Sequence, residues 1–182
     1  MRVVAGSAGG RRLAGPPGTS TRPTSDRVRE ATFNALASLG AIEGAVVLDL
    51  FAGSGALGIE ALSRGASRAT FVDHDPRALA VVRANLATTG LAGAATVVRS
   101  DALRFVTAAP AASFDLALLD PPYRFDDPSW IELLARVGAP LAVVESDRSV
   151  DPGPGWRTLR TRRYGGTVVL LAQRDDPGRQ QA

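Results

Sequence analysis

A short apolar run followed by closely spaced glycines constrains this chain more than any other stretch. Residues 46–51 are Val-Val-Leu-Asp-Leu-Phe, and glycines at positions 53, 55 and 58 follow with GxGxxG spacing. So short a run, rich in valine and leucine, is typical of a strand buried on both faces. A helical pattern with Ile59 and Leu62 on one side comes next. A strand, a glycine turn and a helix in this order predict a site where a nucleoside-containing cofactor lies against bare backbone and helix N–H groups.

The carboxylate of Asp49 favours S-adenosylmethionine over a dinucleotide as that cofactor, whereas Asp73 fits either. Asp73 lies 20 residues after Gly53, at the end of a second apolar run, where it can accept hydrogen bonds from ribose hydroxyls. Asp49 lies inside the first strand, where a carboxylate would repel an anionic pyrophosphate but attract the ammonium and sulfonium of S-adenosylmethionine. The alternative is a helix packed around its glycines with no ligand. It is the weaker interpretation, because a buried Asp49 requires a partner.

Composition narrows the class of protein. At 182 residues, with 45% hydrophobic and 21% charged residues, the chain can build the core of one domain. No apolar run approaches the roughly 18 residues of a membrane span, and the N-terminus has no signal-peptide pattern. The absence of cysteine excludes disulfides, thiolate metal sites and a cysteine nucleophile. We therefore expect a cytoplasmic protein, a monomer, with no membrane partner and no bound metal.

The basic residues are all arginines, and their placement indicates a phosphate-bearing partner. A GC-rich genome can explain why arginine replaces lysine, but not where the arginines occur. Residues 1–24 and 156–174 are basic segments without any acid, whereas the rest of the chain is balanced. Such patches suit a nucleic-acid backbone. Their arginines are Arg2, Arg11, Arg12, Arg22, Arg157, Arg160, Arg162, Arg163 and Arg174.

Alternating strand and helix patterns predict a Rossmann-like α/β fold. After a first helix over 25–39, helical patterns separate the early strands, and the last two strands are joined by a turn at 164–166. These units predict a seven-stranded, mostly parallel sheet with an antiparallel C-terminal hairpin. The predicted strands are residues 46–51, 69–73, 95–98, 114–119, 141–144, 156–163 and 167–172.

Acidic residues recur where these strands end. They are Asp49, Asp73, Asp101 and Asp120. In an open α/β sheet such ends share one rim, where ligands bind. A single acid there would be unremarkable as a helix cap, and Asp101 has that simple alternative, since it precedes a helix over 102–107. We nevertheless expect Asp101 to lie beside the adenine of the cofactor.

The sequence Asp120-Pro121-Pro122-Tyr123 indicates a substrate with an exocyclic amino group. Two prolines after a buried strand form a rigid extended turn without N–H donors, so carbonyl and carboxylate acceptors remain. Acceptors suit the two N–H donors of an amino group, and Tyr123 offers a face on which a base can stack. The alternative is a proline turn with a buried tyrosine.

These motifs resemble those of a known enzyme family. The loop Asp-Leu-Phe-Ala-Gly-Ser-Gly together with Asp-Pro-Pro-Tyr resembles class I S-adenosylmethionine-dependent methyltransferases that act on a nucleobase amino group. Residues 22–30 and 57–66 resemble the ribosomal small-subunit methyltransferase D (RsmD) family, and the similarity extends from Arg2 to about Ala172. That family methylates N2 of one guanine in 16S ribosomal RNA and prefers RNA in the assembled small subunit. The resemblance therefore implies this activity here.

The resemblance also implies roles for individual residues. Thr24, Asp26 and Arg29 would close over the methionine end of the cofactor or over the RNA. The methyl group would pass directly to an unpaired or flipped guanine, without a covalent enzyme intermediate. The implied cofactor-binding residues are Asp49, Phe51, Gly53, Gly55, Asp73, His74, Asp101, Ala102 and Thr24. The implied guanine-binding residues are Asp120, Pro121, Pro122 and Tyr123. The implied RNA-binding residues are Arg2, Arg11, Arg12, Arg22, Arg29, Arg160, Arg162 and Arg163.

We expect three segments: a basic N-terminal arm or hairpin (1–23), a methyltransferase domain (24–175) and a frayed tail (176–182). The arm is rich in glycine and poor in apolar residues, so we place it outside the core and expect the domain to fold without residues 1–20. A loose tail is the alternative for the arm.

Three other functions remain open from sequence. A DNA adenine-N6 methyltransferase could use the same motif, although such enzymes usually carry an added recognition domain. Protein glutamine methylation normally requires Asn rather than Asp at position 120. A non-enzymatic RNA-binding module would not bind S-adenosylmethionine.

Overall fold

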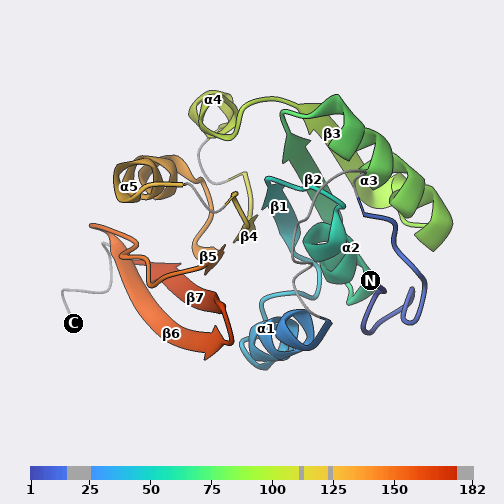
Figure 1. The fold of residues 1–182 in the computed structure, drawn as a ribbon, viewed down its shortest axis with the longest axis horizontal. Helices are drawn as coiled ribbons and strands as arrows, with labels where there is room; N and C mark the ends of the chain where they lie inside the picture. The colour runs from blue at the N-terminus through green and yellow to red at the C-terminus, as the bar shows by residue number, and fades with distance from the viewer. Residues whose placement is uncertain (16–25, 111–112, 123–124, 176–182) are drawn as a thin grey trace.

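The structure of the protein is a computed structural model, and the description takes in all residues except 16–25, 111–112, 123–124 and 176–182. Its centre is one seven-stranded sheet in the order β3-β2-β1-β4-β5-β7-β6 (Figure 1). The strands from β3 to β5 are parallel, and β7 pairs antiparallel with both β5 and β6. The predicted sheet and its C-terminal hairpin are confirmed. The strands are β1 (Val46–Leu50), β2 (Arg68–Asp73), β3 (Ala95–Arg99), β4 (Leu116–Leu119), β5 (Leu141–Ser146), β6 (Trp156–Tyr164) and β7 (Thr167–Arg174).

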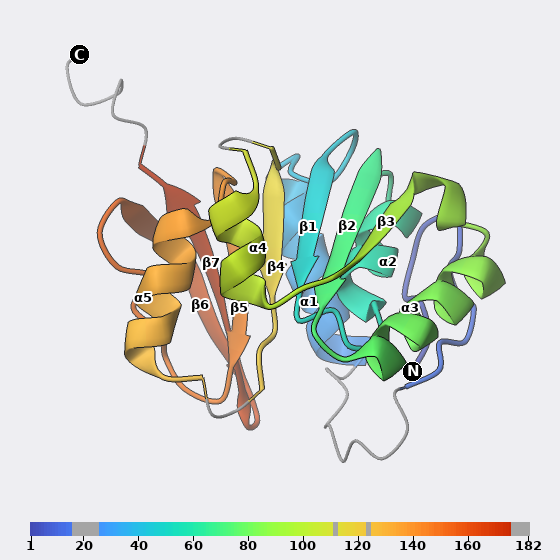
Figure 2. The same cartoon turned by 90° about the horizontal axis from the view of Figure 1, so that it is seen from above.

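Helices cover both faces of the sheet (Figure 2). One apolar cluster joins one face of the sheet to α1 (Asp26–Ser38), α2 (Ala56–Ser63) and α3 (Pro76–Thr89). A second cluster joins the other face to α4 (Ala102–Ala108) and α5 (Asp127–Arg136). Neighbouring residues of β1 point to opposite faces, so Val47 belongs to the first cluster and Leu48 to the second. The central strands are therefore buried on both sides, as their apolar runs predict.

Local capping explains where several helices begin and end. Asp75 caps α3 by accepting a hydrogen bond from the Arg77 N–H, and Pro76 occupies the first helical position. Gly90 ends the same helix in the left-handed conformation, with φ of 77°. A short 3-10 helix, η1 (Ala92–Ala94), then leads into β3.

The N-terminal arm (described residues 1–15) is part of the core, so the prediction that it lies outside is wrong. A β-bridge between Arg2 and Arg12 closes it into a hairpin, which runs beside α2 and α3 (Figure 1). Its side chains Val3, Ala8 and Leu13 are buried in the same cluster as α1 and α2. The arm can pack on the core with few apolar residues because its backbone also forms hydrogen bonds to α2. The predicted boundary at 23/24 and the tail at 176–182 lie outside the described residues, so the division into segments remains a prediction.

The polar contacts between the arm and α2 are extensive. Glu60 accepts hydrogen bonds from the backbone N–H groups of Val4 and Ala5, at 2.7 and 3.1 Å. The Ser63 hydroxyl accepts one from the Ala8 N–H at 3.0 Å. Glu60 and Ser63 are both buried, so these bonds form away from water and fix the arm's position. No helix in the described part of the chain is long and apolar enough to span a bilayer.

Candidate active site

The carboxyl ends of the parallel strands meet at one rim of the sheet. Leu50 of β1 pairs with Val72 of β2 and with Leu119 of β4, and Leu119 pairs with Val144 of β5. The acids that follow these positions consequently lie along the same rim. They are Asp73, Asp120 and Glu145.

The glycine loop (residues 51–55) turns sharply between β1 and α2. Gly53 and Gly55 adopt positive φ angles of 55° and 76°, which favour glycine. Phe51 also has a positive φ, 62°, which is uncommon for a residue with a side chain and often marks a functional site. A Cβ atom on Gly58 would lie 2.4 Å from Cε1 of Phe71, so the start of α2 packs too closely for any other residue. The motif thus has a packing role as well as leaving bare backbone at the rim.

Asp73 is held in place by the backbone on both of its carboxylate oxygens. Oδ2 accepts the Gly53 N–H and Oδ1 accepts the Asp75 N–H, each at 2.9 Å. The side chain is 10% exposed. A carboxylate can accept about four hydrogen bonds, so capacity for ribose hydroxyls remains. The adjacent His74 is exposed, with Nδ1 at 3.5 Å from Asp73 Oδ1.

Asp49 lies beneath the glycine loop and is only 2% exposed. Its Oδ2 accepts a hydrogen bond from the Gly58 N–H at 2.9 Å, in the first turn of α2. Burial is the main cause that raises the pKa of Asp49, to about 8; the Gly58 hydrogen bond acts against it, and repulsion from Asp73 adds to it. The partner that the buried Asp49 requires is therefore the backbone of α2. A cation bound nearby would favour the ionised form of this carboxyl group.

Asp101 serves as the N-cap of α4. Its Oδ1 accepts the Arg104 N–H at 3.0 Å, and its side chain lies at the surface. The simple capping interpretation is thus confirmed. Ala102 is buried at the start of the same helix. The placement of adenine beside these two residues remains a prediction.

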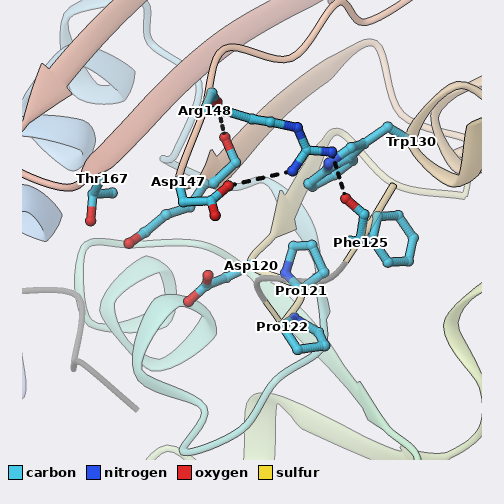
Figure 3. Close-up of a pocket in the computed structure, with 10 residues that line it drawn as sticks. Asp120, Pro121, Pro122, Phe125, Trp130, Asp147, Arg148 and Thr167 are labelled. Carbon is cyan, nitrogen blue, oxygen red and sulfur yellow. Dashed lines mark hydrogen bonds and ion pairs between the residues drawn. The ribbon is translucent and has the colours of Figure 1, made fainter. Parts of the chain in front are cut away.

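A pocket that is open to the solvent lies beside the end of β4 (Figure 3). Asp120, Pro121 and Pro122 form part of its wall, as the sequence predicts, and the wall continues onto the loop after β5 and the start of β7. Tyr123, Thr24 and Arg22 lie outside the described residues. The lining residues are Asp120, Pro121, Pro122, Phe125, Trp130, Glu145, Ser146, Asp147, Arg148 and Thr167.

Several residues of this pocket were not identified from the sequence. Phe125 packs edge-on against Phe51 with ring centroids 5.4 Å apart, and against Trp130 at 5.0 Å. The aromatic row joins the glycine loop to the pocket. Glu145 could have been identified, because it follows the apolar run of β5 just as Asp73 follows the apolar run of β2. Phe125 and Trp130 carry no comparable sequence signal.

Arg148, in the loop after β5, forms hydrogen bonds to the segment after β4. Its Nη2 donates to the Phe125 carbonyl and to Asp127 Oδ1, both at 2.7 Å (Figure 3 shows the first bond). The hydrogen bond to Asp127 is the main cause that raises the pKa of Arg148 above its usual value, with a further contribution from Asp147. The pocket wall at Phe125 is therefore tied to the sheet by a guanidinium.

The prediction that Arg29 contacts RNA is wrong. Its side chain is 0% exposed and lies between α1 and α2. Nη2 pairs with Asp26 Oδ1 at 2.8 Å and donates to the Arg2 carbonyl, and Nε lies 3.5 Å from Glu60 Oε2. The buried carboxylate of Glu60 requires a cation close by, and Arg29 supplies it. The two residues are far apart in sequence, so the sequence does not indicate this pairing. The other described candidates are exposed, namely Arg2, Arg11, Arg12, Arg160, Arg162 and Arg163.

The sheet order, the glycine loop and the acids along the rim define a class I methyltransferase. Comparison with known proteins identifies the family: the model of the family described as Conserved hypothetical protein 95 matches residues 1–173, and the chain belongs to it. The Bacillus subtilis protein YlbH is 49% identical over 94% of this chain and 97% of its own.

Other relatives agree with this assignment. Ribosomal RNA small subunit methyltransferase D of Escherichia coli K12 is 36% identical, over 100% of this chain and 94% of its own. The solved structure of Escherichia coli yhhF is 38% identical, with a TM-score of 0.81 over 96% of this chain and 98% of that one. The resemblance to the RsmD family is confirmed.

Proposed function

We propose that this enzyme transfers a methyl group from S-adenosylmethionine to the N2 amino group of a guanine in 16S ribosomal RNA, within the small subunit. The observation that carries the proposal is the adjacency of two sites. The glycine loop anchored by Asp73 and the pocket walled by Asp120 lie at the ends of neighbouring strands and are joined by the Phe51–Phe125 contact. The name of the Escherichia coli relative, a small-subunit ribosomal RNA methyltransferase, supports the substrate class.

The residues at the rim fit S-adenosylmethionine by their chemistry. Asp73 would accept the ribose hydroxyls, the glycine loop would lie along the nucleoside, and Asp49 would attract the ammonium and sulfonium charges from beneath. Phe51, His74, Asp101 and Ala102 would complete the site, with Thr24 near the methionine end. Asp49 would disfavour an anionic pyrophosphate, which is why the proposal is a methyl donor and not a dinucleotide.

Asp120 and the Pro121 carbonyl would bind the guanine by accepting its amino N–H bonds, while Pro122 shapes the turn and Tyr123 stacks on the base. This binding orients the nitrogen lone pair, which is otherwise delocalised into the ring. The bound cofactor supplies an electrophilic methyl group on its sulfonium. Asp120 would also take the proton that the amino nitrogen loses, and positioning of this kind can account for much of the rate enhancement.

Exposed arginines would bind the RNA backbone on two sides of the pocket. Strand β6 is parallel to β5, because both pair antiparallel with β7, so its Tyr164 end lies at the same rim as Glu145. Arg160 and Arg162 lie opposite Leu171 and Val169 of β7, and therefore point to the face of the sheet that α1 covers. Arg163 points to the other face. Arg2, Arg11 and Arg12 of the arm would extend the contact, and the enzyme would act as a cytoplasmic monomer.

Mass spectrometry of ribosomal RNA from a deletion strain tests the proposal. We expect one N2-methylguanosine of 16S RNA to disappear, to return with the intact chain, and not to return with Asp120→Ala. Methylation of DNA adenine in its place, or an unchanged nucleoside profile, would contradict the proposal.

A further inference from the structure

Asn85 of α3 uses its whole amide group to join two segments that are distant in sequence. The side chain is buried, with 2% of the residue exposed. Its Oδ1 accepts the Ala14 N–H at 2.9 Å, and its Nδ2 donates to the Ala14 carbonyl at 2.9 Å. The second N–H of Nδ2 donates to the Ser54 carbonyl at 2.8 Å. Ala14 belongs to the arm and Ser54 to the glycine loop.

The bond to Ser54 controls the geometry of the glycine loop. The Ser54 carbonyl and the Gly55 N–H belong to one planar peptide unit, so fixing one fixes the direction of the other. Gly55 is the residue before α2, and its N–H donates to the Ala52 carbonyl. Gly55 has φ of 76° and lies against the side chains of Phe71 and Val82. These side chains leave the Ser54–Gly55 peptide little room to rotate.

The arm approaches the same loop by other contacts. The Met1 sulfur lies 3.5 Å from the Ser54 hydroxyl, and the backbone of residues 4–8 is bound to Glu60 and Ser63 of α2. The arm therefore supports the back of the glycine loop, and Asn85 is the described side chain that bonds to both.

We propose that Asn85 is a positioning residue that locks the N-terminal arm to the glycine loop, so that the order of the arm and the affinity for the cofactor are linked. The link to the cofactor rests on the proposed function, whereas the lock itself does not. An amide is required because the site needs one acceptor and two donors in a single plane. Linkage is reciprocal, so a ligand in the glycine loop also orders the arm.

The test compares Asn85→Asp with Thr89→Val in the full-length protein. The aspartate keeps the acceptor for the Ala14 N–H but removes both donors, and leaves the Ala14 and Ser54 carbonyls facing an anion. Thr89 is buried one turn further along α3, and among the described contacts its hydroxyl bonds to the helix carbonyls of Asn85 and Leu86, so its loss does not touch the loop.

Hydrogen exchange without ligand is the first measurement. We expect Asn85→Asp to speed exchange both in residues 1–15 and in residues 52–56, and Thr89→Val to do so in neither beyond its effect on overall stability. Faster exchange in only one of the two segments, or the same pattern in both variants, would overturn the lock.

Calorimetry with S-adenosylhomocysteine is the second measurement. We expect Asn85→Asp to bind roughly tenfold more weakly than wild type, since each unsatisfied buried carbonyl carries an appreciable cost. The deficit should shrink as pH falls, because the protonated acid regains one donor. Equal affinity of variant and wild type would overturn the link to the cofactor. A wild-type protein that binds no S-adenosylhomocysteine would instead overturn the proposed function, and hydrogen exchange would still decide the lock.

Discussion

Asp49 accepts a hydrogen bond from the Gly58 N–H at 2.9 Å, so a buried carboxylate of β1 lies against the first turn of α2. One hydrogen bond does not offset the burial, which raises the pKa of Asp49 to about 8. The folded protein without cofactor therefore favours the protonated acid. The protonation state of Asp49 therefore affects the contact between β1 and α2, next to the glycine loop.

Asp49→Asn should change how stability depends on pH. The folded-state pKa is above the unfolded value, so the contribution of Asp49 is fully present below about pH 4 and is lost as pH rises through about 8. The asparagine variant lacks this loss. We expect its melting temperature, relative to wild type, to rise from acidic to alkaline pH, while its affinity for S-adenosylmethionine falls because the carboxylate charge is gone. A difference in melting temperature that stays constant with pH would contradict the assignment.

Asp73→Ala should weaken cofactor binding more than it weakens the fold. It removes the acceptor for the Gly53 and Asp75 N–H groups as well as the proposed ribose contacts, each worth about 1.5–3 kcal/mol to a charged acceptor. Asp75→Ala is the matched control, since Asp75 caps α3 and has no bond to the glycine loop in the described contacts. Calorimetry with S-adenosylhomocysteine should show a loss of tenfold or more for Asp73→Ala only.

Asp120→Ala should keep cofactor affinity and lose nearly all methyl transfer. The proposed role of Asp120 is to accept from the guanine amino group, on the pocket side of the rim. Asp115→Ala is the control from the same region, because Asp115 precedes β4 at its opposite end and accepts the Val46 N–H. Single-turnover assays with small subunits measure the transfer. A near wild-type rate in Asp120→Ala would exclude the mechanism.

The sheet and its rim could be predicted because each follows from local pattern. Apolar runs of strand length separated by helical patterns define parallel strands, and the acids that follow those strands must share a rim. Contacts between distant segments could not be predicted in this way. Arg29 and Glu60 appear in sequence as ordinary surface charges, and only the packing of α1 on α2 makes them a buried pair.

The burial of the arm cannot be predicted from sequence for a related physical reason. Val3, Ala8 and Leu13 show no regular period, so nothing in the local pattern indicates burial. Their burial depends on α2 and on Asn85, more than 50 residues away in sequence. Phe125 and Arg148 of the pocket are similar cases, because their roles arise from two loops that meet only in the folded sheet.

Arg162→Gln and Arg163→Gln should weaken binding to the small subunit and reduce its dependence on salt. Both side chains are exposed near the rim end of β6. Each phosphate contact removed should lower the slope of log affinity against log salt by about 0.7–0.9. Arg136→Gln, an exposed arginine on α5 that pairs with Glu132, should leave the slope unchanged. If all three variants had the same slope of log affinity against log salt as wild type, the RNA would not contact Arg162 or Arg163.

Truncation of the arm should unfold part of the domain, in contrast to the sequence-based expectation. Loss of residues 1–15 would expose the Arg29–Glu60 pair and remove the partners that Ser63 and Asn85 have in the arm. Point variants test this without deleting RNA contacts. Leu13→Ala, in the buried part of the arm, should lower the free energy of unfolding by about 2–5 kcal/mol. Leu39→Ala, at an exposed leucine 53% accessible, should change it by about 0.5 kcal/mol or less. If denaturant titrations showed equal and small changes in the free energy of unfolding for both variants, the arm would be an appended tail and not part of the core.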